Sequence, residues 1–130
     1  MNTLLKNLLV LSASALTLQA QAAPYTAIVP AKSSVTFSYK QMGVGMDGRF
    51  KKFAAQVNFD PAKADQAKAS FEVDLASVDT GSGEADDEVV TKSWFNTAAF
   101  PKASFVAKQI KQTAPNQYEV QGTLSIKGLS

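Results

Sequence analysis

The stretch Trp94-Phe95-Asn96-Thr97-Ala98-Ala99-Phe100-Pro101-Lys102-Ala103-Ser104-Phe105 decides the fold of this chain more than any other. It predicts the aromatic end of a short helix, a turn at Pro101 and the start of a strand, because proline cannot continue a helix and alternation follows it. A joint of this kind is a structural signature and carries no reactive group. The case for a function therefore depends on the architecture and on the apolar interior.

The composition leaves little catalytic chemistry. The 130-residue chain has no histidine and no cysteine, which excludes imidazole acid/base catalysis, thiol nucleophiles, disulfides and zinc sites built from these residues. It carries 13 Lys and Arg against 11 Asp and Glu, so nothing favours nucleic acid or an anionic membrane as a partner. We expect no cofactor, no metal and no enzymatic activity.

The first 22 residues have the pattern of a secretory signal peptide. Lys6 precedes an apolar run over residues 8–18, and Ala20-Gln21-Ala22 predicts cleavage before Ala23. The alternative, a transmembrane anchor, needs a longer apolar span. The expected mature chain, residues 23–130, is one domain with a net charge near +1, because Lys6 is lost with the signal. We expect a periplasmic location, with secretion as the alternative.

Apolar and polar residues alternate along most of the mature chain. This period of two predicts strands with one apolar and one polar face, which is typical of an antiparallel sheet around an interior. The strands are expected at residues 34–40, 52–59, 67–75 and 117–126, with two weaker ones at Tyr25 to Val29 and Ala103 to Ile110.

The segment from Met42 to Gly48 is expected to be a flexible glycine-rich loop, since it lacks the strand-to-helix context of a phosphate loop. The only helix expected after the signal runs from about Glu84 to Trp94, with Ser82 as its cap. Acidic residues crowd its first turn. Their spacing does not fit a calcium loop, and we interpret them as compensation of the helix dipole.

Six motifs, in order along the mature chain, resemble the YceI-like family of exported, lipocalin-like proteins. They are Ser34-Val35-Thr36-Phe37, Gly48-Arg49-Phe50-Lys51-Lys52-Phe53, Val57-Asn58-Phe59-Asp60, Ser77-Val78-Asp79-Thr80-Gly81, the Trp94 to Phe105 joint, and Gly122-Thr123-Leu124-Ser125-Ile126-Lys127-Gly128. The resemblance implies an all-β antiparallel barrel with one short helix, enclosing an elongated apolar tunnel. It also implies binding, storage or transport of a long isoprenoid-type lipid without catalysis.

The chain departs from the family pattern in three places. Many members have histidine at the position of Gln41, and an Arg-Asp-x-His-Leu run where this chain has Ala85-Asp86-Asp87-Glu88-Val89. Family members also continue with further strands after Lys127-Gly128, so the sequence looks like a fragment whose barrel is incomplete because the C-terminal strands are missing. Unpaired edge strands would make such a fragment prone to open or aggregate.

If the apolar faces point inward, the inward set lines the interior. Its members are Val35, Phe37, Tyr39, Phe53, Ala55, Val57, Phe59, Ala69, Phe71, Val73, Leu75, Ala103, Phe105, Val120, Gly122 and Leu124. Periodicity alone leaves open whether these side chains fill a tight barrel or surround a tunnel. Lys40, Gln41 and Arg49 flank the glycine-rich segment and are candidate contacts for a polar lipid head group.

Three other functions remain open at this point. A packed periplasmic, stress-linked protein without fixed cargo has the same alternation. A carboxylate-dependent hydrolase would have to pair two of Asp74, Asp79, Asp86 and Asp87 across a cleft. An outer-membrane barrel would turn the apolar faces outward, but the aromatic residues do not form two girdles. The oligomeric state and a membrane-bound delivery partner are also left open.

Overall fold

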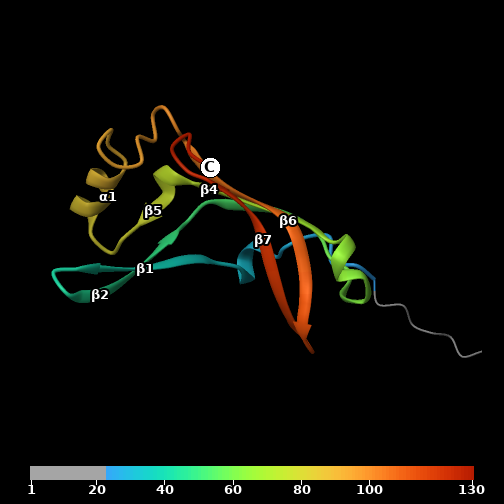
Figure 1. The fold of residues 1–130 in the computed structure, drawn as a ribbon. Helices are drawn as coiled ribbons and strands as arrows, with labels where there is room; N and C mark the ends of the chain where they lie inside the picture. Colours follow the sequence, from blue (N-terminus) through green and yellow to red (C-terminus); the bar gives the residue numbers. More distant parts are fainter. Residues whose placement is uncertain (1–22) are drawn as a thin grey trace, which may run out of the picture.

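Two antiparallel sheets make up the part of the chain that the computed structural model describes, residues 23–130 (Figure 1). The three-stranded sheet has the order β1-β2-β5, with β1 at Val35–Gln41, β2 at Val44–Phe50 and β5 at Val78–Asp79. The four-stranded sheet has the order β3-β4-β6-β7, with β3 at Phe53–Asn58, β4 at Lys68–Asp74, β6 at Lys102–Ala114 and β7 at Gln117–Ser125. The predicted signal peptide lies outside the described residues.

Short helices complete the described chain. The α-helix α1 spans Gly83–Val89, and three 3₁₀ turns occupy Pro30–Lys32 (η1), Pro61–Gln66 (η2) and Leu75–Ser77 (η3). Figure 1 shows α1 at the same end of the molecule as the turn between β1 and β2, with the green η2 segment at the other end. No helix within residues 23–130 combines the length and the apolar character needed to cross a bilayer.

The sheets are linked at a corner around Ser77. The Lys52 backbone N–H donates to Ser77 Oγ at 2.9 Å, and Ser77 Oγ donates to the Asp74 carbonyl at 2.7 Å. The Leu75 N–H donates to the Pro101 carbonyl at 2.9 Å, so the turn at Pro101 is fixed to the same corner. Leu75, 1% exposed, is the most buried large side chain of the described residues.

Five of the six expected strands are confirmed, with small shifts of their ends. The strand expected at Tyr25 to Val29 is wrong: only Tyr25 pairs, in an isolated bridge with Phe59. The expected loop from Met42 to Gly48 is also wrong. Met42 and Gly43 alone form the turn, with φ of 51° and 81°, and the rest of that segment belongs to β2. Alternation did not show this strand because two of its residues are glycines.

Gly48 has a packing role in β2 because it lies directly opposite Phe37 on β1. A Cβ at position 48 would lie 2.6 Å from Phe37 Cε2 and 2.9 Å from the Asp79 carbonyl oxygen. Glycine is therefore required so that the Phe37 ring can cross the neighbouring strand.

The helix begins where it was expected and ends earlier. The Ser82 side chain accepts from the Ala85 N–H, which confirms the predicted cap. The helix stops at Val89 instead of Trp94, and Thr91 Oγ1 donates to the Glu88 carbonyl at 2.7 Å. Residues 90–100 continue as turns, with Asn96 in the left-handed region at φ 50°. The Thr91 hydroxyl competes for a carbonyl that an extended helix would use.

Candidate functional site

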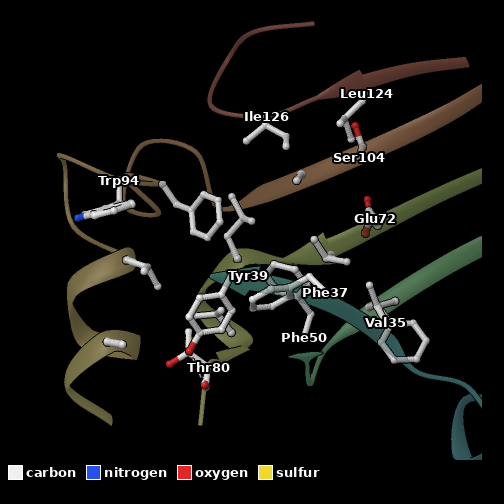
Figure 2. A pocket seen from close by; sticks show the side chains of 18 of the residues that line it. Val35, Phe37, Tyr39, Phe50, Glu72, Thr80, Trp94, Ser104, Leu124 and Ile126 are labelled. Atoms are coloured by element: carbon white, nitrogen blue, oxygen red, sulfur yellow. Dashed lines mark hydrogen bonds between the residues drawn. The ribbon is translucent and has the colours of Figure 1, made fainter. Parts of the chain in front are cut away.

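A cavity of about 1130 Å³ lies between the two sheets and α1 (Figure 2). Strands β1, β3, β4 and β6 supply half of its apolar lining residues. This volume is slightly above the range usual for small-molecule sites, about 300–1,000 Å³. Phe71 is 43% exposed and Leu124 is 54% exposed, because the described strands do not close around the cavity.

Ten residues of the inward set line this cavity: Val35, Phe37, Tyr39, Phe53, Phe71, Val73, Leu75, Ala103, Phe105 and Leu124. Their common position follows from strand register, since partners such as Phe71 and Phe105 sit directly opposite each other on adjacent strands. The apolar faces therefore turn inward, as the alternation predicted.

Six residues of the inward set do not line the cavity: Ala55, Val57, Phe59, Ala69, Val120 and Gly122. Phe59 instead packs edge-on against Tyr118, with ring centroids 4.9 Å apart, and stacks on Tyr25 at 6.3 Å. These rings cluster at this end of the interior, where Val120 is still 44% exposed. The sequence left open a filled barrel or a tunnel, and the described residues show an aromatic cluster next to an unfilled cavity.

A bulge in β6 changes which residues face inward. The register with β7 shifts between Ala107 and Gln109, so Ile110 lies opposite Val120 and is 6% exposed. Simple alternation from Phe105 places Ile110 on the outer face. A bulge inserts one residue and reverses the inward and outward positions beyond it, and no local pattern around Ala107 signals it.

Sequence reasoning also missed an aromatic and aliphatic group at the α1 end of the cavity: Phe50, Val78, Ala85, Val89, Trp94, Phe95 and Ile126. Phe50 links the two parts of the lining, with ring centroids 5.3 Å from Phe37 and 6.5 Å from Phe95. Ala85 and Val89 are four residues apart on α1, so they share one face. That spacing was readable in the sequence, but which sheet it faces was not.

Polar side chains gather at the same end of the cavity. Lys40 and Gln41 belong to the lining, together with Thr80, Ser82, Glu84 and Glu88. Arg49, the third candidate head-group contact, is absent from the lining. Its Nε donates to Asp79 Oδ2 at 3.1 Å, which places it in an ion pair between β2 and β5. Glu72 and Ser104 also line the cavity, although by strand alternation they belong, like Lys40, to the face opposite the apolar set.

Asp86 fixes the start of α1 to the wall of the cavity. Its Oδ1 accepts from the Thr80 N–H at 2.6 Å and from Thr80 Oγ1 at 2.7 Å, and Thr80 is only 5% exposed. The Tyr39 hydroxyl donates to the Thr80 carbonyl at 2.9 Å. Compensation of the helix dipole is therefore an incomplete account of Asp86, which is the acceptor for a buried backbone donor.

The four carboxylates considered for hydrolysis do not line the cavity. Asp74 accepts from the Ala76 N–H at 3.0 Å, and Asp79 accepts from the Gly81 N–H at 3.1 Å. The Gly81 hydrogen bond and the Arg49 guanidinium hold the pKa of Asp79 below its ordinary value. Within residues 23–130, no three acidic side chains come together as a metal site would require.

An antiparallel barrel around an apolar cavity is the architecture of lipocalin-like proteins. Comparison with known sequences identifies the group more narrowly. The family model described as "YceI-like domain" matches residues 26–130, and the chain belongs to that family.

Two curated relatives and two solved structures illustrate the similarity. The chain is 32% identical to the UPF0312 protein plu2095 of Photorhabdus laumondii, over 96% of this chain and 67% of that protein. It is 32% identical to a UPF0312 protein of Shewanella denitrificans, over 77% of this chain and 53% of the relative.

Among solved structures, Burkholderia cenocepacia BcnA is 46% identical at a TM-score of 0.74, covering 78% of this chain and 64% of that one. A Campylobacter jejuni YCEI protein is 28% identical at a TM-score of 0.62, covering 80% and 61%. The chain thus spans between about half and two thirds of these relatives. Its two unclosed sheets correspond to an incomplete lipocalin-like barrel.

Proposed function

We propose that the protein binds a long apolar lipid of the isoprenoid type in the cavity between its two sheets, for storage or transport and without catalysis. The observation that supports this most directly is the unfilled apolar volume of about 1130 Å³ lined by inward-facing strand residues. Membership of the YceI-like family supports the same ligand class. The predicted signal peptide adds a periplasmic location to the proposal.

The binding free energy would come from the lipid tail. Burial of apolar surface contributes roughly 0.8 kcal/mol per CH₂-sized group, so one five-carbon isoprene unit gains on the order of 3 to 4 kcal/mol before the costs of association. A few units reach tight binding. The rings of Phe37, Phe50, Phe53 and Phe105 offer this contact without polar groups that would lose hydration.

The head group is proposed to lie at the α1 end, because the polar lining is concentrated there. Lys40 and Gln41 can donate hydrogen bonds to a phosphate or quinone oxygen. A polar head left at the cavity mouth keeps its hydration and contributes mainly orientation, whereas the same head among the phenylalanines would be desolvated without partners.

Native mass spectrometry of the full-length protein purified from its own cells, followed by lipid extraction, tests the proposal. A reproducible apolar adduct that extracts into organic solvent supports it. An adduct-free protein whose intact barrel is filled by side chains would overturn it and would favour the alternative without fixed cargo.

A paired substitution tests whether the cavity itself is the site. Phe71→Asp places a charge on the cavity wall, and Val106→Asp places the same charge on the same sheet at a residue that does not line the cavity. The two positions are 43% and 50% exposed in the described residues, and circular dichroism checks that both variants fold. We expect at least a roughly tenfold loss of affinity for a fluorescent apolar probe in Phe71→Asp only, because that charge would be desolvated by the bound tail. Equal losses in both variants would place the site elsewhere.

A further inference from the structure

The turn between β1 and β2 breaks two structural rules at one residue. Met42 is 98% exposed, although methionine is usually found inside, and its φ of 51° places it in the left-handed region. A two-residue hairpin turn with left-handed backbone strongly prefers Asn, Asp or Gly at its first position. Asparagine at position 42 would therefore stabilise this turn better than methionine does. Such an outlier is a reason to look for a role outside folding.

The turn lies at the end of an apolar track that continues from the cavity. Val44 pairs with Gln41, and Met46 pairs with Tyr39, and both Gln41 and Tyr39 line the cavity. Side chains two apart on a strand share a face, so Val44 and Met46 extend the inner face of β2 toward Met42. Val44 is 62% exposed although it lies on this inner face.

A second apolar group projects at the same end of the molecule. Figure 1 shows the β1–β2 turn and α1 at this end, and Figure 2 shows Trp94 beyond α1 at the margin of the cavity. Trp94 is 56% exposed, and its Nε1 donates to Glu88 Oε1 at 3.1 Å. A tryptophan with an apolar body and a bonded polar edge suits a boundary between lipid and water.

The charges at this end are of both signs. Lys40 precedes the turn, and Glu84, Asp87 and Glu88 lie on α1. One lysine against three carboxylates leaves an excess of negative charge, which a purely anionic surface would repel, whereas headgroups that carry both a phosphate and an ammonium can pair with both signs.

We propose that this end of the protein docks on a phospholipid bilayer with zwitterionic headgroups, such as phosphatidylethanolamine, inserting Met42 and Val44 between the headgroups. The apolar track then connects the bilayer to the cavity, and a lipid tail can pass along it without entering water. The biological purpose of docking rests on the proposed lipid binding, but docking can be measured without any cargo.

Flotation of the full-length protein with phosphatidylethanolamine/phosphatidylcholine vesicles tests the proposal. Met42→Asn should reduce the bound fraction at limiting lipid roughly tenfold, the equivalent of about 1.4 kcal/mol. The same substitution should raise the urea midpoint, because asparagine suits the turn better. Loss of binding together with gained stability cannot be attributed to misfolding.

The matched control is Val29→Asn, at a residue that is 57% exposed and precedes η1, before β1 rather than at its far end. It should leave vesicle binding unchanged. Because insertion is apolar, binding should also persist when salt rises from about 0.1 M to about 1 M, where the Debye length falls from about 10 to 3 Å.

The outcomes separate docking from lipid binding. Vesicle binding by the wild-type protein with no lipid adduct would preserve docking and overturn the proposed function. A lipid adduct with no vesicle binding would support the proposed function and overturn the docking proposal. Equal binding by Met42→Asn and wild type, binding that salt abolishes, or a Met42-dependent dimer in place of vesicle binding would each overturn the docking proposal.

Discussion

Replacing Asp86 with alanine will lower the free energy of unfolding by roughly 2 to 4 kcal/mol. The buried Thr80 N–H loses its acceptor, which costs about 1–3 kcal/mol. The Thr80 hydroxyl keeps the Ser82 carbonyl at 3.1 Å as an acceptor, so its loss is smaller, about 0.5–1.5 kcal/mol. Both estimates concern one residue of a seven-residue helix that forms part of the cavity wall.

Two further variants separate this hydrogen-bonding role from a general charge effect. Asp86→Asn keeps an acceptor oxygen but loses the charge, so its cost should be about 1–2 kcal/mol. Asp87→Ala removes a neighbouring exposed carboxylate and should cost about 0.3–1 kcal/mol, the amount typical of a charge in the first turns of a helix.

Urea unfolding of the full-length protein, followed by far-ultraviolet circular dichroism and by tryptophan fluorescence, measures the series. Trp94 is the single tryptophan and is bonded to Glu88 on α1, so its fluorescence reports whether the helix detaches before the sheets unfold. The expected order of cost is Asp86→Ala, then Asp86→Asn, then Asp87→Ala. If the first and last variants lose the same stability, the reasoning is refuted and dipole compensation is sufficient.

Three shorter predictions follow from the same structure. Gly48→Ala should lower the free energy of unfolding in urea by about 1–3 kcal/mol, because the new Cβ would clash with Phe37. Gly45→Ala has open space around its Cβ and should leave this free energy nearly unchanged. Similar losses in the two variants would argue against the Phe37 contact. The pKa of Asp79 is lowered in the folded state, so its carboxylate stabilises the fold above the unfolded pKa of about 3.9, and this stabilisation is lost as the pH falls through the folded pKa. The stability advantage of wild type over Asp79→Asn should therefore vanish in acid. A stability difference that stays constant with pH would contradict this. Lipid retention should vary little between about pH 6 and about pH 8, since the chain has no histidine; a steep change in lipid release over that range would count against this.

Much of the strand arrangement was readable from the sequence because alternation is a local property. Val35, Phe37 and Tyr39 point one way in any extended chain, and the same holds along β3, β4 and β7. The family followed from six motifs in order, and the family match over residues 26–130 confirms it. Local reasoning failed where a residue departs from its local rule, as Gly45 and Gly48 do inside β2 and as the β6 bulge does before Ile110.

The candidate site, too, was partly predictable from local sequence patterns and partly decided by tertiary contacts. The sequence by itself determined which face of each strand is apolar, that histidine and cysteine chemistry is excluded, and that Ser82 caps a short acidic helix. Only the tertiary structure decided that Phe59 packs against Tyr118 away from the cavity, while Phe37, Phe50 and Phe95 border the cavity. The tertiary structure also brings Arg49 into an ion pair with Asp79, and it places the Asp86 carboxylate where it accepts a hydrogen bond from the Thr80 N–H. The reason is physical: the direction of a side chain follows from its own backbone, but the space in front of it depends on strands distant in sequence.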